Sequence, residues 1–231
     1  MAQFHLTLLG GFELVHHASG PLRVPPGRLR ALLGRLAFHP GQSQSRGDLA
    51  SLLWGGRPER AARHSLNQAL SQLRVIAGCD LFVQDGDRLT LASDRVACDV
   101  DEVRRLTRDG SPSALQHAGA LCQGPLLDGI DVAAPEFEEW LRMARAEVED
   151  LMVAVHEARL AVLSVEGDPD EAAAIAEALI GIDPLNERGH RALIAAATAQ
   201  GATTRALQIY ETFRQRLEDE LGVAPEQDTA R

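Results

Sequence analysis

The chain has 231 residues and a formal net charge of −10 at pH 7, so it is long enough for two domains of ordinary size. It has no signal peptide and no run of about 18 apolar residues that could span a bilayer, and we expect a soluble, cytoplasmic protein. The three cysteines, Cys79, Cys98 and Cys122, form no CxxC pair, which favours small buried side chains over a disulfide framework or a zinc site.

The charge is divided unevenly along the chain. Residues 1–98 contain 11 arginines and 7 acidic residues, a net charge of +4, whereas residues 99–231 contain 12 arginines and 26 acidic residues, a net charge of −14. A basic half joined to an acidic half indicates a nucleic-acid-binding part and a protein-contacting part. We therefore predict two domains, residues 1–98 and residues 99–231.

The N-terminal segment combines short strands with helices. Apolar residues alternate over residues 3–24 and are interrupted by glycine-containing turns, which predicts a small antiparallel sheet of three strands. A helix over 28–39 follows and ends at Pro40-Gly41.

Two further helices and a hairpin come next. Ser45 is the expected N-cap of a helix that ends at Trp54, and Gly55-Gly56 is expected to end it in the left-handed conformation. A longer helix is predicted over 59–77. A hairpin is predicted next, with apolar residues Leu81 and Val83, the turn Asp85-Gly86-Asp87, and then Leu89 and Leu91. The order predicts a winged helix-turn-helix.

The polar face of the 59–77 helix carries no acidic residue after Glu59. Its arginine, amide and hydroxyl side chains match the hydrogen-bonding groups of a major groove. The alternative is a solvated surface helix, although such faces usually mix both charges. The exposed set is Arg60, Arg63, His64, Asn67, Gln68, Ser71, Gln72 and Arg74.

The remaining chain is predicted to be helical. Two short helices are expected over 103–107 and 112–122, a long amphipathic helix from Pro135, and three more over 170–182, 185–200 and 203–221. Gly167 and Gly201 are 34 residues apart, and apolar positions align at that offset, as in a tetratricopeptide repeat. The fold class is therefore an α+β winged helix followed by an all-α, TPR-like repeat domain, which provides a surface for proteins or peptides.

This order of elements resembles the streptomycete antibiotic regulatory proteins, which join an OmpR/PhoB-type winged helix to a bacterial transcriptional activator domain. The matching stretches are LRALLGRLAFHPG (29–41), SRGDLASLLW (45–54), SLNQALSQLR (65–74), PEFEEWL (135–141), GDPDEAAAIAEALIGIDPLNERGH (167–190) and ALQIYETFRQRLEDELGVAP (206–225). The resemblance implies a transcriptional regulator, often an activator, that binds direct repeats of double-stranded DNA near promoters as a homodimer and contacts RNA polymerase. It also implies recognition positions on the 59–77 helix and at Arg88 of the wing.

The expected roles divide into base contacts and phosphate contacts. Asn67 and Gln68 are expected to contact adenine, and His64, Ser71 and Gln72 other base edges, while Arg46, Arg63, Arg74 and Arg88 hold phosphates. The alternative function is a protein-interaction adaptor whose winged helix does not bind DNA. An enzyme is not expected, because the chain lacks a nucleophile elbow, an HExxH motif and a phosphate loop, and no cofactor or metal is predicted.

Overall fold

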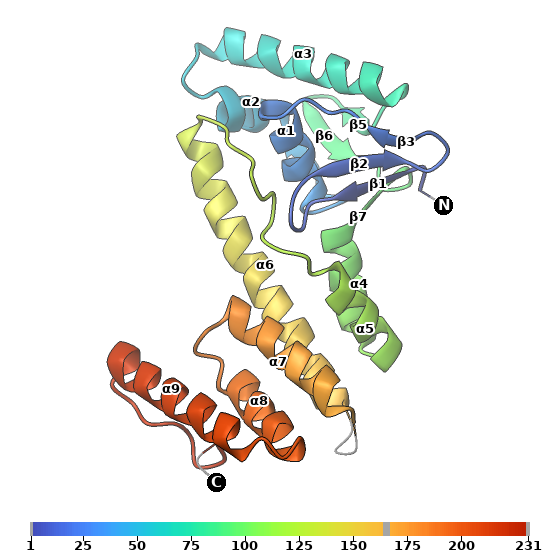
Figure 1. Cartoon of the computed structure of the whole chain (residues 1–231). Helices are drawn as coiled ribbons and strands as arrows, with labels where there is room; N and C mark the ends of the chain where they lie inside the picture. Colours follow the sequence, from blue (N-terminus) through green and yellow to red (C-terminus); the bar gives the residue numbers. More distant parts are fainter. Residues whose placement is uncertain (1, 164–166, 230–231) are drawn as a thin grey trace. The chain divides into compact units, whose positions relative to one another are not determined.

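The computed structural model describes residues 2–163 and 167–229 (Figure 1). By contacts among residues the chain divides into two compact units. The first contains residues 1–105 and 120–148, and the second contains residues 106–119 and 149–231. Neither unit is continuous in sequence, so these units do not follow the change of charge at residue 98, and the domain boundary proposed there stays a prediction. No helix in the described part is long and apolar enough to cross a membrane.

The first unit contains a four-stranded sheet in the order β3-β2-β1-β7. Strand β1 pairs antiparallel with β2 and parallel with β7, and β2 pairs antiparallel with β3. The three N-terminal strands match the predicted sheet. The fourth was not predicted, because it has three residues and pairs with a strand about ninety residues earlier. The strands are β1 (Phe4–Thr7), β2 (Glu13–His16), β3 (Gly20–Leu22) and β7 (Val96–Cys98).

Helix α4 (Asp99–Asp109) follows β7 directly, four residues before its predicted start. Asp99 is 2% exposed, and its carboxylate accepts hydrogen bonds from the backbone amides of Leu8 and Leu9 at 2.8 and 2.9 Å. The acidic residue that was expected to mark a boundary therefore lies in the core of the first unit. Burial, followed by the charge of Asp99, raises the pKa of the neighbouring Cys98 thiol.

Three helices pack together in the first unit, α1 (Arg28–Ala37), α2 (Arg46–Trp54) and α3 (Glu59–Ala77). Ser45 is the N-cap of α2, as predicted, and its hydroxyl accepts from the backbone amides of Gly47 and Asp48. Helix α2 ends at Trp54, as predicted, but the left-handed conformation predicted for its end was wrong, because Gly55 has right-handed helical torsion angles. The buried side chains of the three helices include Leu32, Leu33, Leu36, Leu53, Leu66 and Leu73.

The wing is a three-stranded antiparallel sheet in the order β4-β6-β5. Of the apolar residues of the predicted hairpin, Val83 is 57% exposed. The register gives the reason: Leu89 lies opposite Gln84 and Leu91 opposite Phe82, and paired residues share a face, so Val83 belongs to the other face. Strand β4 was not predicted. The strands are β4 (Gln44–Ser45), β5 (Phe82–Asp85) and β6 (Arg88–Leu91).

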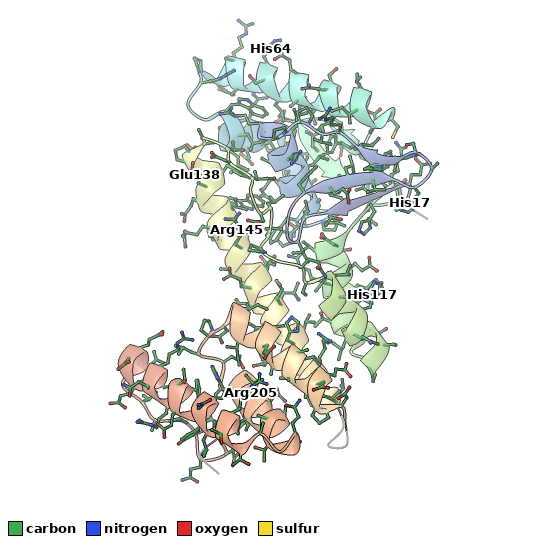
Figure 2. The ribbon with its side chains drawn as sticks, viewed as in Figure 1. His17, His64, His117, Glu138, Arg145 and Arg205 are labelled. Carbon is green, nitrogen blue, oxygen red and sulfur yellow. The ribbon has the colours of Figure 1, made fainter. Side chains whose placement is uncertain are left out.

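Residues 120–148 complete the first unit. Leu127 is fully buried with φ 52°, and its amide donates to the Leu8 carbonyl at 2.7 Å. Its side chain covers Gly34, where an added Cβ would lie 2.7 Å from Leu127 Cδ1. Arg145 fixes this segment, because its guanidinium donates to the carbonyls of Leu126 and Leu127 at 2.9 and 3.1 Å (Figure 2). Trp140 packs its ring edge-on against Phe38, with centroids 5.8 Å apart.

The second unit is helical. Helix α7 packs against α8, and α8 packs against α9. Helices α7 and α9 begin 34 residues apart, as the predicted repeat requires. In α8, His190 stacks on Phe213 of α9 with ring centroids 4.0 Å apart. The helices are α5 (Pro112–Leu121), α6 (Pro135–Val162, of which residues 149–162 belong to this unit), α7 (Pro169–Ile182), α8 (Glu187–Ala199) and α9 (Thr203–Leu221).

Candidate nucleic-acid interface

Helix α3 is held to the first unit by one apolar stripe and one satisfied polar side chain. Ser65 is buried, and its hydroxyl donates to the Ala61 carbonyl at 3.0 Å and accepts from Arg57 Nη1 at 3.1 Å. Gly78 ends the helix at φ 71°, where a side chain would be strained. The apolar stripe is formed by Ala62, Leu66, Ala69 and Leu73.

The opposite side of α3 is exposed along its length. All eight side chains that the sequence predicted there are exposed, and His64 lies on the outer side of the helix (Figure 2). We call the seven from Arg63 onward the α3 face: Arg63, His64, Asn67, Gln68, Ser71, Gln72 and Arg74.

A hollow of about 360 Å³ lies where α3 meets the wing. It brings together two predicted phosphate contacts and one predicted base contact. Arg88, on β6, is turned to Ser43 instead, with Nε 2.6 Å from the hydroxyl oxygen. The hollow is lined by Arg46, Arg63, Leu66, Asn67, Gln84, Gly86 and Asp87.

Acidic side chains offset much of the positive charge of the α3 face. Arg63 pairs with Glu59 Oε1 at 3.1 Å and with Asp87 Oδ1 at 3.2 Å, and Arg74 pairs with Asp80. Among the arginines of α3, Arg60 has no ion pair with any residue that the structure describes. These exposed pairs are weak and can be exchanged for other anions.

Sequence reasoning missed Gln84 and the acids that pair with the arginines. Gln84 Oε1 accepts from Arg46 Nη1 at 2.9 Å, and its Nε2 donates to the Gly86 carbonyl at 3.1 Å. Buried Leu89 lies opposite Gln84 in the hairpin, and paired residues of neighbouring strands share a face. The alternation of the wing, counted from Leu89, therefore places Gln84 on the face of that leucine. No comparable signal identifies Asp80 and Asp87, because their pairing depends on how the wing folds against α3.

The described residues contain no group of three or more His, Cys, Asp or Glu side chains that could hold a metal ion. The α3 face itself presents hydrogen-bonding groups and the guanidinium groups of Arg63 and Arg74. Such a surface is suited to binding a polar, anionic partner.

The model of the bacterial transcriptional activator domain family matches residues 93–231, more than half of the chain and outside the α3 face. The chain is 28% identical over 209 residues to the regulatory protein AfsR of Streptomyces griseus, covering 87% of this chain and 21% of that protein. It is also 28% identical over 240 residues to the transcriptional regulator RedD of Streptomyces coelicolor, covering 95% of this chain and 66% of that protein. The chain therefore spans about a fifth of AfsR and about two thirds of RedD.

A solved structure has the same fold. Mycobacterium tuberculosis EmbR, in complex with a low affinity phosphopeptide, superposes with a TM-score of 0.73 at 23% identity, over 100% of this chain and 64% of that chain. This likeness confirms the predicted winged helix followed by a helical repeat domain. With the family match it also confirms the resemblance to the streptomycete antibiotic regulatory proteins, and the chain belongs to the bacterial transcriptional activator domain family, a family of transcriptional regulators.

Proposed function

We propose that the chain is a transcriptional activator that binds double-stranded DNA sequence-specifically through the α3 face and the wing. The observation that carries this proposal is the exposed α3 face itself, whose amide, hydroxyl, imidazole and guanidinium groups include no carboxylate. Major-groove edges are recognised by this set of groups. The nine proposed contact residues are Arg46, Arg63, His64, Asn67, Gln68, Ser71, Gln72, Arg74 and Arg88.

We propose that the two halves of the sequence have different functions, DNA binding and transcriptional activation. Residues 1–98, with a net charge of +4, form the DNA-binding domain, and residues 99–231 form the activator domain that contacts RNA polymerase. An excess of four positive charges gives moderate attraction to phosphate. We therefore propose that the chain binds direct repeats near promoters as a homodimer, because the binding free energies of two half-sites add. The proposed compartment is the cytoplasm.

The proposed roles are tested by one base contact and one phosphate contact. Asn67→Ala should relax the base preference at one position, by about 1–3 kcal/mol of discrimination. Arg74→Ala should instead weaken binding to every sequence and reduce the salt slope by about one. Gel-shift titrations of the purified chain at several salt concentrations measure both effects. Equal losses on all sequences from the two variants would contradict this division of roles.

A second function is favoured by the intramolecular pairing of Arg63 and Arg74 with acidic residues. A surface whose positive charge is already offset suits a protein partner, and the chain would then be an adaptor whose winged helix does not bind DNA. The two functions differ at low salt. An adaptor binds no genomic fragment there, whereas a DNA-binding regulator binds specific and non-specific duplexes alike.

A further inference from the structure

Arg46 joins α3 to the wing. It is the first residue of α2 and is half-buried, and its backbone amide donates to the Asp87 carbonyl at 2.8 Å. Its guanidinium donates from Nη1 to Gln84 Oε1 at 2.9 Å and from Nη2 to Asn67 Oδ1. One side chain thus holds two amides, one from the wing and one from the α3 face.

These contacts fix which way the Asn67 amide points. A guanidinium only donates hydrogen bonds, so the Asn67 atom that faces Arg46 is its oxygen, and the NH₂ group is turned away from it. Gln84 holds Arg46 in place, because its oxygen accepts from Arg46 while its NH₂ group donates to the Gly86 carbonyl at 3.1 Å. Both ends of the Gln84 amide are therefore occupied, the oxygen by Arg46 of α2 and the NH₂ group by the Gly86 carbonyl of the wing.

An asparagine that recognises adenine uses both ends of its amide, since the oxygen accepts from N6 and the NH₂ group donates to N7. With its oxygen engaged by Arg46, Asn67 presents its NH₂ group, the end of the amide that has no partner among the described residues. A donor alone fits best where a base presents acceptors without a neighbouring donor: guanine has the adjacent acceptors O6 and N7 and thymine has O4, whereas the N7 acceptor of adenine lies beside its N6 donor.

We infer that Arg46 is a positioning residue that holds Asn67 as a hydrogen-bond donor and so directs it to an acceptor edge of guanine or thymine. This inference rests on the proposed function and differs from the phosphate role expected of Arg46 and the adenine role expected of Asn67. The two amide bonds use two of the five guanidinium N–H groups of Arg46 and fix its orientation. The exposed Arg60, without an ion pair among the described residues, is better placed for a phosphate contact.

The experiment is selection of bound duplexes from a random library with the full chain, followed by titration of the selected sequences. The variants are Arg46→Ala, Arg46→Lys and Asn67→Ala, and Arg60→Ala is the matched control. The base pair whose preference is lost in Asn67→Ala marks the position that Asn67 contacts. The wild-type chain should select guanine or thymine as the contacted base there.

Both Arg46 variants should change the preference at that same position by about fivefold or more, with adenine gaining, because the released amide can turn both ends to a base. A lysine keeps the charge but has no planar fork to hold two amides, so Arg46→Lys separates positioning from charge. Arg46→Ala should add nothing further to Asn67→Ala in the double variant. Arg60→Ala should weaken binding to all sequences and leave the preference unchanged.

Two results would overturn the inference while leaving DNA binding intact. One is a uniform loss of affinity in Arg46→Ala, like that of Arg60→Ala, with the base preference retained. The other is selection of adenine at the Asn67 position by the wild-type chain. Failure of the wild-type chain to enrich any sequence, even at low salt, would refute the proposed function and the inference with it.

Discussion

Asp80→Asn should tighten DNA binding, because it releases Arg74 from its intramolecular partner. The pair is exposed on both sides, with 64% of the Arg74 side chain and 52% of the Asp80 side chain accessible. In the free chain a phosphate must displace the Asp80 carboxylate before Arg74 can contact it. The substitution keeps the shape of the side chain and removes its charge.

The magnitude follows from two terms. Breaking an exposed ion pair costs about 0.2–1 kcal/mol, and DNA binding by the variant no longer includes this cost. Removing a carboxylate about 8 Å from a phosphate relieves about 0.5 kcal/mol of repulsion in water. Together these correspond to an affinity about 3- to 12-fold higher at low salt, and the gain should shrink as salt screens both terms.

The assay is a titration of one duplex by fluorescence anisotropy at two salt concentrations. Asp94→Asn is the control, because it removes the same charge from the same unit, from an acid that faces Arg95 at 3.9 Å and not the α3 face. Arg74→Gln in the Asp80→Asn background should remove the ion-pair contribution and leave only the relieved repulsion, a gain of about twofold. Equal affinities for Asp80→Asn and Asp94→Asn, or a gain that Arg74→Gln does not reduce, would refute the reasoning.

Two predictions concern stability. Gly34→Ala should lower the free energy of unfolding by about 1–3 kcal/mol, because the new Cβ meets buried Leu127 at 2.7 Å. Gly181→Ala is the control and should stabilise α7, because nothing lies within 4 Å of its new Cβ. Thermal unfolding followed by circular dichroism compares the two variants, and equal shifts in their midpoints would contradict the packing argument. Burial, followed by the charge of Arg159, lowers the pKa of His156 to about 4 in the folded chain. The unfolded chain therefore takes up this proton first, and the stabilisation present above pH 6.5 is lost between pH 6.5 and about 4, by roughly 3 kcal/mol. Urea unfolding at pH 7.5 and 4.5 should show a smaller pH-dependent loss for His156→Gln, and a loss equal to that of the wild-type chain would contradict the prediction.

The sequence predicted best where a pattern was long and local. Helix α3 has the predicted bounds, because its apolar stripe extends over five turns and glycine follows it. The cap at Ser45 and the 34-residue repeat were also confirmed, since each depends on residues close together in the chain. The exposed side of α3 followed from the same periodicity.

Features that depend on distant pairing were not predicted. Strands β4 and β7 have two and three residues, too few to show an alternation, and each forms by pairing with a strand far away in sequence. The burial of Asp99 was not predicted, because the sequence does not show that two backbone amides lie within hydrogen-bonding distance of it. The contacts that set the chemistry of the α3 face, Arg46 with Gln84 and Arg74 with Asp80, likewise exist only once the wing has folded.

The covering of Gly34 by Leu127 has a consequence for how the N-terminal unit matures on the ribosome. A nascent chain that ends at residue 98 lacks the leucine over Gly34, the Asp99 carboxylate bound by the amides of Leu8 and Leu9, and the tryptophan beside Phe38. In a chain that stops at residue 98, those apolar surfaces and backbone donors would lack the partners that the longer chain supplies. The smallest fragment that carries the α3 face and folds on its own should therefore extend well past residue 98, where the net charge changes sign.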